Sequence, residues 1–420
     1  MMDTEVFVYI DLGDDAVLVG RLWARTRRGR DSASFEYDTA WLRHPERFAL
    51  EPALQLGPGP FHTPAEKPMF GAIGDSAPDR WGRVLMRRAE RRRADRSGTT
   101  PSTLREIDYL LMVNDEARLG ALRFARDPGG PFLAADDMTP IPPLVELPRL
   151  LSAAENVGTE SASDENLRLL LAPGSALGGA RPKASVRDKN KQLAIAKFPH
   201  KDDDFDAVRW EAVALSIASK AGIPVPEWRI EVVSDKPVLL LRRFDRTGRG
   251  RIPFLSAMSM LGARDNEMHS YLEFVDALRQ HGASPRSDIQ ALWRRIVFSV
   301  LISNTDDHLR NHGFLYDGPD GWRLAPAYDL NPVPVDVRPR VLATAINVDD
   351  NSASLELALS VASYFELEEP EARVVTAEVG QAVRSWREEA TRLGLVASQL
   401  DRMASAFEHN DSRMALSLAK

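Results

Sequence analysis

The residues best suited to chemistry lie in one polar segment that follows an apolar stretch, Asn304-Thr305-Asp306-Asp307-His308-Leu309-Arg310-Asn311. Asp306 and Asn311 are five positions apart, like the catalytic aspartate and the metal-binding asparagine of a kinase catalytic loop. In such a loop the carboxylate orients the attacking hydroxyl group, and the amide oxygen holds magnesium without adding charge. The spacing therefore predicts Asp306 as a catalytic aspartate and Asn311 as a metal ligand in a phosphoryl-transfer site.

A second acidic residue, Asp329, ends the segment Pro326-Ala327-Tyr328-Asp329, which follows a turn and an expected strand. Asp329 stands where a kinase places the aspartate that bridges magnesium to the β- and γ-phosphates. Magnesium prefers hard oxygen ligands and is commonly held by one or two carboxylates together with phosphates. Asn311 and Asp329 are therefore the predicted protein ligands of a magnesium ion.

A lysine lies near the end of a predicted strand, Leu193-Ala194-Ile195-Ala196-Lys197-Phe198. Because both faces of this strand are apolar, its ammonium group is expected to be partly buried, and burial without a partner would be costly. A nucleotide phosphate, together with a carboxylate such as Glu211 on the next predicted helix, would offset this cost. A strand lysine followed by a helix glutamate is the ion-pair order of protein kinases.

A stretch with several glycines lies upstream of Lys197 and runs from Pro173 to Ala184. Glycines let backbone N–H groups approach phosphate oxygens. The stretch has neither the Walker A spacing nor the Gly-x-Gly-x-x-Gly pattern, so its spacing alone is a weak signal. The predicted ATP contacts in this stretch are Ser175, Ala176, Leu177, Gly178, Gly179, Ala180 and Lys183.

Each of these features has an alternative explanation. Asp306, His308 and His312 could together form a zinc or iron site, because the two histidines are one helical turn apart. Asp306 could serve only the structure of a loop, Lys197 could extend to solvent, and the glycine stretch could be a plain turn. The order along the chain (glycine stretch, lysine, helix glutamate, Asp-x4-Asn, aspartate) favours the kinase interpretation.

The elements around these residues indicate a β-rich start, a mixed β part and a helical part. Apolar runs predict strands at 6–10 and 17–23, and a basic helix is expected after 71–79. Residues 168–245 are predicted to form strands around one helix at 207–221. The other predicted elements are strands at 192–198 and 237–244, a buried helix at 288–303 and helical segments at 352–419.

Glycine and proline residues at 126–148 predict a boundary. The predicted domains are an accessory β-rich subdomain at 1–140, a β-rich nucleotide-binding lobe at 141–245 and a helical catalytic lobe at 246–420. This layout is an α+β, protein-kinase-like two-lobe fold, and a nucleotide cleft between a sheet lobe and a helical lobe would fit it.

The composition is that of a folded globular protein, with 420 residues, 44% of them hydrophobic, and a net charge of −7. The chain has no cysteine, which excludes disulfides and cysteine-ligated zinc. No apolar stretch approaches the roughly 18–20 residues that span a bilayer. The first residues lack the basic and apolar parts of a secretory signal, so we expect a cytoplasmic protein with no membrane contact.

One local charge run departs from the acidic average, since residues 83–96 carry seven arginines against Glu90 and Asp95. A solvated helix face is the usual meaning of such a run. A surface that contacts phosphate or a partner is the alternative. The arginines are Arg83, Arg87, Arg88, Arg91, Arg92, Arg93 and Arg96.

Several motifs together resemble the HipA family of serine/threonine kinases, and the resemblance covers nearly the whole chain. These motifs are Gly74-Asp75-Ser76-Ala77-Pro78-Asp79-Arg80-Trp81-Gly82-Arg83, Leu177-Gly178-Gly179-Ala180-Arg181-Pro182-Lys183-Ala184, Arg243-Phe244-Asp245-Arg246, Asn304 to Asn311, and Pro326-Ala327-Tyr328-Asp329. The resemblance implies an N-terminal accessory β-rich subdomain, a small β lobe and an all-helical C-terminal lobe.

The resemblance also implies functional roles for residues that the motifs contain. It implies Asp306 as the catalytic aspartate, Asn311 and Asp329 as magnesium ligands, and Lys197 as a contact to phosphate. The segment formed by Arg242, Arg243 and Phe244 would face adenine through backbone groups, and His308 would lie in the ATP site. Ser175 would be a site of autophosphorylation, because a phosphate there would compete with ATP for the same N–H groups.

The family further implies a small helix-turn-helix antitoxin of the HipB type as a partner, with DNA bound indirectly through it. The implied protein substrate is one such as an aminoacyl-tRNA synthetase. Two other functions stay open at this point. One is a catalytically weak binding subunit of an antitoxin–DNA repressor complex, and the other is a small-molecule or lipid kinase.

Overall fold

The structure is a computed structural model that describes residues 3–13, 15–135, 141–157, 163–174, 176, 178–248 and 250–418. The chain divides into two compact units. Unit 1 comprises Met1–Asp202 and Glu231–Leu255, and unit 2 comprises Asp203–Ile230 and Ser256–Lys420.

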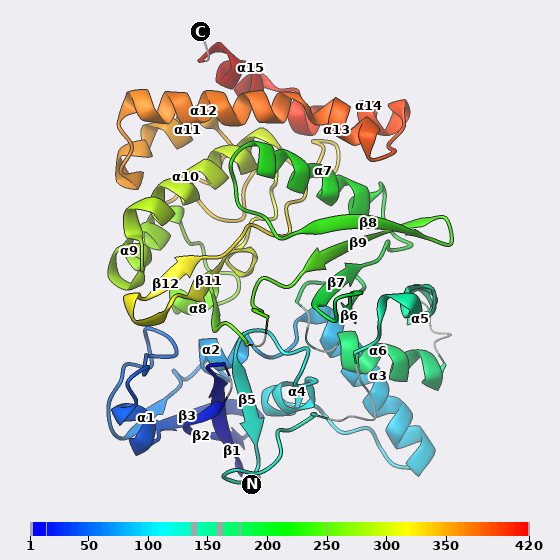
Figure 1. The fold of residues 1–420 in the computed structure, drawn as a ribbon, viewed down its shortest axis with the longest axis vertical. Coiled ribbons are helices and arrows are strands. Elements are labelled where there is room, and N and C mark those ends of the chain that lie inside the picture. Colours follow the sequence, from blue (N-terminus) through cyan, green and yellow to red (C-terminus); the bar gives the residue numbers. More distant parts are fainter. Residues whose placement is uncertain are drawn as a thin grey trace. The chain divides into compact units, whose positions relative to one another are not determined.

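A sheet of five strands forms the N-terminal part of unit 1 (Figure 1). Val6, Val8 and Ile10 alternate along its first strand and are fully buried, as expected for apolar residues on one face of a strand. The strands predicted at 6–10 and 17–23 are confirmed. In the order β4-β3-β2-β1-β5, the strands are β4 (Pro60–His62), β3 (Arg30–Tyr37), β2 (Ala16–Arg27), β1 (Asp3–Asp11) and β5 (Leu122–Ala125).

Helices make up much of the rest of unit 1. The predicted basic helix is α3 (Arg80–Ser97), which ends at Gly98 in the left-handed conformation. Residues 168–174 were expected within a strand-rich region, but they belong to the helix α6 (Asp164–Gly174). Leu167 and Leu170 of α6 are buried on one helix face, and a short apolar run alone does not separate a helix from a strand. The other helices are α1 (Thr39–Arg43), α2 (Gly71–Gly74), α4 (Glu106–Met112), η1 (Leu144–Glu146) and α5 (Leu147–Val157).

A second sheet of unit 1 carries the predicted lysine strand. Its order is β6-β7-β9-β8, and β7 pairs antiparallel with both β6 and β9. The strands predicted at 192–198 and 237–244 are therefore confirmed as β7 and β9. The members are β6 (Lys183–Arg187), β7 (Leu193–Lys197), β9 (Lys236–Arg242) and β8 (Trp228–Val233), of which residues 231–233 belong to unit 1.

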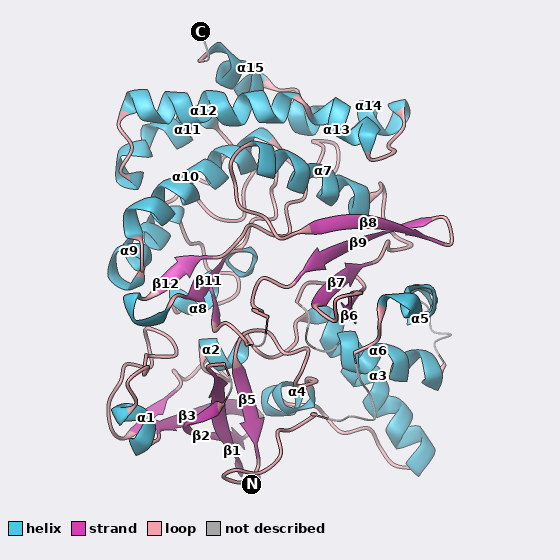
Figure 2. Ribbon diagram, viewed as in Figure 1, coloured by secondary structure: helices cyan, strands magenta, loops and turns pink. Residues whose placement is uncertain are grey.

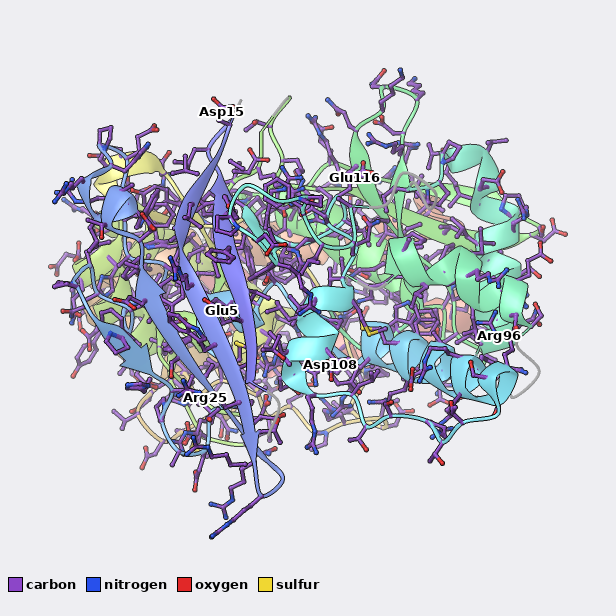
Figure 3. All side chains as sticks on the ribbon, turned by 90° about the horizontal axis from the view of Figure 1, so that it is seen from below. Glu5, Asp15, Arg25, Arg96, Asp108 and Glu116 are labelled. Carbon is purple, nitrogen blue, oxygen red and sulfur yellow. The ribbon has the colours of Figure 1, made fainter. Side chains whose placement is uncertain are left out.

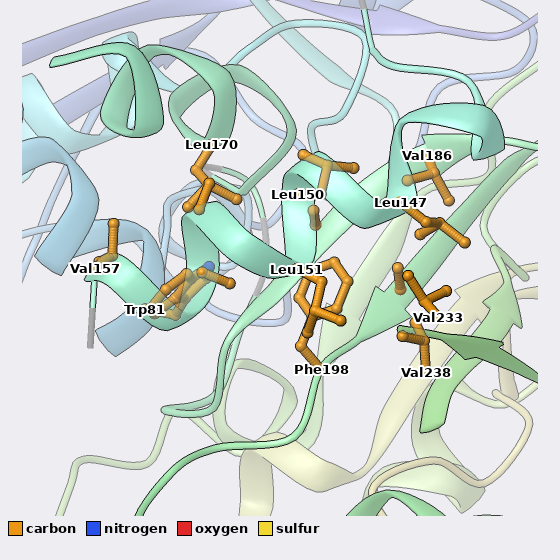
Figure 4. Packing of buried hydrophobic residues seen from close by; sticks show 14 of the residues in the cluster. Trp81, Leu147, Leu150, Leu151, Val157, Leu170, Val186, Phe198, Val233 and Val238 are labelled. Carbon is orange, nitrogen blue, oxygen red and sulfur yellow. The ribbon is translucent and has the colours of Figure 1, made fainter. Parts of the chain in front are cut away.

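One apolar cluster joins this sheet to the helices α3, α5 and α6 (Figure 4). Trp81 and Leu85 come from α3, and both are buried. Burial of such side chains is the main favourable contribution to the stability of a fold. Their partners in the cluster include Leu147, Leu150, Leu151, Leu170, Val186, Ala196, Phe198 and Val238.

Unit 2 consists mostly of helices (Figure 2). The helices predicted at 207–221 and 288–303 are confirmed as α7 (Ala207–Lys220) and α10 (Pro285–Leu301). A hairpin, β11 (Gly313–Tyr316) with β12 (Trp322–Leu324), follows α10 in the chain and precedes the later helices. The remaining elements are β10 (Phe254–Ser256), which starts in unit 1, and then α8 (Ala257–Met260), α9 (Tyr271–His281), η2 (Leu309–Asn311), η3 (Gly318–Asp320), α11 (Leu355–Ser360), η4 (Ala362–Phe365), α12 (Glu369–Arg384), α13 (Trp386–Arg392), α14 (Ala397–Phe407) and α15 (Asn410–Ser417).

Candidate active site

The Asp-x4-Asn segment of unit 2 begins just after α10 and runs into the short turn η2. Asp306 is exposed, with a side-chain exposure of 52%, whereas its neighbours Thr305 and Asp307 are buried. Asn304 is also buried, and its Oδ1 accepts a hydrogen bond of 3.1 Å from the N–H of Asn331. The segment is thus anchored on both sides of one solvent-exposed carboxylate.

Asn311 is fixed by a hydrogen bond to the backbone of Asp306. Its Nδ2 donates to the Asp306 carbonyl oxygen at 2.7 Å. A carbonyl oxygen can only accept, so this bond determines which end of the amide is the nitrogen. No described residue donates to the Asn311 Oδ1, which therefore remains an oxygen donor suited to magnesium.

Asp329 has a left-handed backbone conformation with φ of +53°, which is uncommon for a residue other than glycine. Eight other non-glycine residues of the described chain also have a positive φ, and such residues cluster at active sites and in turns. The hydroxyl of the preceding residue, Tyr328, donates to the Arg310 carbonyl at 2.9 Å. Because Arg310 precedes Asn311, this bond ties the chain at Asp329 to the chain at Asn311. An amide oxygen and a carboxylate on tied segments fit a magnesium ion.

Arg338 contacts the predicted catalytic carboxylate, and the sequence interpretation missed it. Its Nη1 lies 3.2 Å from Oδ1 of Asp306, and both side chains are about half exposed. The segment with Arg338 is anchored by Arg340, whose guanidinium donates to Asp411 Oδ2, to Ser303 Oγ and to the Val300 carbonyl. No local spacing could have indicated this contact, because 32 positions separate Arg338 from Asp306.

Asp307 joins the Asp-x4-Asn segment to residues 343–344. Its Oδ2 accepts from the Tyr271 hydroxyl, and its Oδ1 accepts from the Ala343 N–H at 3.0 Å. Its carbonyl accepts from Thr344 Oγ1 at 2.7 Å. Burial raises the pKa of Asp307 to about 7, although the bonds from Tyr271 and Ala343 oppose this shift.

His312 is buried beside the same tyrosine, so the alternative metal site is not formed. Its ring lies edge-on to Tyr271, with centroids 5.5 Å apart, and burial lowers its pKa to about 3. Across the described ranges, no group of three or more His, Cys, Asp or Glu residues could hold a metal ion. His308 is half-buried, and its Nδ1 is buried without a hydrogen-bond partner in the described part of the chain.

In unit 1, the predicted phosphate-binding stretch lies between α6 and β6. Gly178 and Ala180 are exposed, and Gly179 has a φ of +77°, which strongly favours glycine. Ala176 is buried in a cluster with Met86 and Leu193, so only its backbone could reach a ligand. Ser175 and Leu177, both predicted ATP contacts, lie outside the described residues.

Two predicted lysines of unit 1 lie on neighbouring strands and are opposite each other in the register of β6 and β7, Lys183 with Lys197. Lys183 is buried, and Lys197 is half-buried. Glu211, the predicted partner of Lys197, lies on α7 in unit 2 and is buried. The pairing of Lys197 with Glu211 stays a prediction.

The predicted adenine-facing segment continues from the end of β9. The N–H of Arg243 donates to the Leu193 carbonyl at 3.1 Å, so it serves the sheet. The Arg243 guanidinium is buried and donates to the Asp245 carboxylate and to the Ala117 carbonyl. The N–H and the guanidinium of Arg243 therefore have structural partners in unit 1, while adenine contacts through the backbone of Arg242, Arg243 or Phe244 stay predictions.

Four of the eight arginines of the basic helix α3, among them Arg96 (labelled in Figure 3), pair with acids of unit 1. Within the described residues, Arg87 and Arg91 are exposed and have no hydrogen-bond or ion-pair partner. This pattern is mostly that of a solvated, internally paired helix face. The pairs are Arg83 with Glu106, Arg92 and Arg96 with Asp164, and Arg93 with Glu90.

In the described part of the chain, no helix has the length and apolar character needed to cross a membrane.

The fold as a whole is similar to a known one. HipA of the Shewanella oneidensis MR-1 toxin–antitoxin system, solved with HipB and operator DNA, matches with a TM-score of 0.67 and 17% identity. The match covers 98% of this chain and 96% of that chain. The protein thus has the predicted α+β, protein-kinase-like two-lobe fold.

A match in sequence identifies the family of the chain. Residues 175–387, more than half of the chain, match the family described as the HipA-like C-terminal domain. The chain belongs to this HipA family.

Two relatives from Sinorhizobium fredii are similar in sequence. The protein named "Putative kinase Y4mE" is 25% identical over 349 residues, which is 75% of either chain. The protein named "Putative kinase Y4dM" is 30% identical over 133 residues, or 29% of this chain and 32% of that protein.

Proposed function

We propose that the protein is an ATP- and magnesium-dependent serine/threonine protein kinase of the HipA type. The observation that carries this proposal is the hydrogen bond from the Asn311 amide to the Asp306 carbonyl. It places an exposed carboxylate and an available amide oxygen in one turn, as a kinase catalytic loop requires. Membership of the HipA family and the names of the relatives support the same activity.

Unit 2 supplies the groups that act at the transferred phosphoryl group. Asp306 accepts or orients the proton of the attacking hydroxyl, since its carboxylate reaches solvent. Asn311 and Asp329 would hold the magnesium ion through oxygen atoms. The ion, when bound, neutralises charge on the β- and γ-phosphates. Asp307 and Tyr271 keep the loop in place from within the protein.

Unit 1 supplies contacts to the rest of the nucleotide. We assign the backbone of Gly178 and Ala180 and the side chains of Lys183 and Lys197 to the phosphates, while Gly179, whose N–H donates to Asp79, would give the stretch its shape. The backbone near Arg242 and Phe244 would face adenine, and Glu211 of unit 2 would orient Lys197. We also retain the division into 1–140, 141–245 and 246–420 as the accessory, nucleotide-binding and catalytic parts.

The biological role that we propose is the toxin of a type II toxin–antitoxin system in the cytoplasm. The structural relative from Shewanella oneidensis was solved with HipB and operator DNA. By analogy, this protein would bind a small HipB-like helix-turn-helix antitoxin, and DNA through it. Its substrate would be a protein such as an aminoacyl-tRNA synthetase. Autophosphorylation of Ser175 would add nearly two negative charges beside the phosphate-binding stretch and inactivate the enzyme.

The test is transfer of label from ATP in the presence of magnesium to the protein itself and to added acceptors. Asp306→Asn should lose about 100-fold or more of the rate, because a positioned general base contributes that much. Asp276→Asn is the matched control, since Asp276 is an exposed carboxylate on α9 of the same unit. Equal transfer by wild type and Asp306→Asn would remove Asp306 from its role. Phosphopeptide mapping of the labelled protein would show whether Ser175 is modified.

A further inference from the structure

The start of α3 holds the phosphate-binding stretch of unit 1 by three hydrogen bonds. The N–H of Gly179 donates to Asp79 Oδ2 at 3.0 Å, and the Gly179 carbonyl accepts from the Trp81 N–H at 3.1 Å. The indole Nε1 of Trp81 donates to the Lys183 carbonyl at 2.8 Å. Both backbone groups of Gly179 are therefore bound by residues that lie about 100 positions earlier.

Asp79 accepts a hydrogen bond from Gly179 instead of capping its own helix, α3. It is the N-cap residue of α3, and an aspartate there ordinarily accepts from an N–H in the first turn of its own helix. Asp79 makes no such capping bond. Its carboxylate serves Gly179, and this indicates that its role lies in the stretch rather than in the helix.

Trp81 gives the contact a rigid base. The side chain is only 5% exposed and belongs to the apolar cluster with Leu85 and Leu150 (Figure 4). A Cβ atom added at Gly174, the last residue of α6, would lie 2.7 Å from Leu85 Cδ1 and 3.2 Å from Trp81 Nε1. The helix before the stretch thus packs directly on the residues that hold the stretch.

The conformation of Gly179 favours glycine, and a side chain there would displace the end of Lys183. Besides its φ of +77°, a Cβ atom there would lie 2.6 Å from the Lys183 Nζ. The buried Lys183 therefore lies against one side of Gly179, while Asp79 accepts from the N–H of Gly179. The N–H and the carbonyl of Gly179 are thus both held by hydrogen bonds.

We propose that Asp79 is a positioning residue that fixes Gly179 in the shape that a nucleotide phosphate chain requires. The proposal rests on the proposed function, in which this stretch binds the phosphates. A stretch that is already ordered loses less conformational freedom when a ligand binds. Removal of the Asp79 bond should therefore weaken nucleotide binding, without removing any group that takes part in the chemistry.

The first test uses hydrogen exchange of the backbone amide of Gly179 in the protein without nucleotide. Asp79→Ala should raise its exchange rate about tenfold, as expected for the loss of one hydrogen bond. Asp79→Asn keeps an acceptor oxygen and should stay within about twofold of wild type. Asp95→Ala, an exposed carboxylate near the other end of α3, is the matched control. Wild-type exchange in Asp79→Ala would overturn the proposal.

The second test measures KM for ATP and kcat in the same variants. Asp79→Ala should raise KM about tenfold and leave kcat within about twofold, because the bond affects binding alone. Asp79→Asn should restore a KM near that of wild type. Tighter ATP binding by Asp79→Ala would overturn the proposal, since the carboxylate would then compete with phosphate.

The two tests separate this inference from the proposed function. If wild type neither binds nor hydrolyses ATP, the proposed function fails, and the nucleotide part of this inference fails with it. The exchange of Gly179 would still decide whether Asp79 holds the stretch. A thermal unfolding curve of Asp79→Ala close to that of wild type would show that a change in exchange is local.

Discussion

The Tyr328 hydroxyl donates to the carbonyl of Arg310 at 2.9 Å. These two residues directly precede Asp329 and Asn311, the predicted ligands of magnesium. One hydrogen bond thus links the two segments that would have to hold the same ion. The strained φ of +53° at Asp329 lies next to this link. The geometry of the site therefore depends on a residue that has no chemical role of its own.

Tyr328→Phe should weaken the response to magnesium. Loss of the hydroxyl frees the Asp329 segment from the Asn311 segment, so more metal is needed to bring the ligands together. We expect the magnesium concentration for half-maximal phosphotransfer to rise about three- to tenfold, the range for one hydrogen bond. The measurement is the rate against magnesium at saturating ATP. Tyr364→Phe, an exposed tyrosine of unit 2, is the control; equal shifts in both variants would contradict the argument.

Arg338→Ala should release the Asp306 carboxylate and raise the rate of phosphotransfer. Both members of the pair are about half exposed, and such pairs contribute at most about 1 kcal/mol. The increase should therefore not exceed about fivefold. High salt should reduce the difference between variant and wild type, because it screens exposed charges. A fall in rate would show that Arg338 assists transfer instead of restraining Asp306.

The titrations of Asp307 and His312 should have opposite and nearly equal effects on how the free energy of unfolding depends on pH. The pKa of Asp307 rises from 3.8 to about 7 on folding, and that of His312 falls from 6.5 to about 3. Between about pH 4 and 6.5, the folded state holds a proton on Asp307, and the unfolded state holds one on His312. Each state binds one proton in total, so this pair contributes little slope.

Replacing either residue alone should reveal the two opposite slopes of the free energy of unfolding against pH. In His312→Gln, the remaining Asp307 contributes stability that is complete below about pH 4 and lost as the pH rises to 7. In Asp307→Asn, the remaining His312 contributes stability that is complete above pH 6.5 and lost as the pH falls towards 3. Each slope should approach about 1.4 kcal/mol per pH unit. Urea unfolding at pH 4.5 and 6.5 measures this, and slopes of the same sign in both variants would contradict the account.

Local patterns in the sequence were enough to predict several helices and strands and the Asp-x4-Asn segment of unit 2. The helix α10 was predicted from apolar residues at helical spacing, and the strand β7 was predicted from a short run that is apolar on both faces. The proximity of Asp306 and Asn311 could be predicted because both residues belong to one short turn of the chain. The helix α6 was missed, because its apolar run suits either period and its burial depends on α3 and α5.

Contacts between distant segments could not be predicted from spacing. Arg338 reaches Asp306 across 32 positions, and Asp79 reaches Gly179 across 100. Each depends on how whole elements pack, a property that no short window of sequence contains. Asp79, the residue before α3, makes no capping bond and instead accepts from the N–H of Gly179 in the predicted phosphate-binding stretch.

Calorimetric titration of the purified protein with ATP tests the central claim most directly. We expect saturable binding that requires magnesium and weakens about tenfold or more in Asp329→Asn, which lacks one charged ligand of the ion. Asp276→Asn should bind as wild type does. Absence of binding by wild type, or binding that ignores both magnesium and Asp329, would contradict the account.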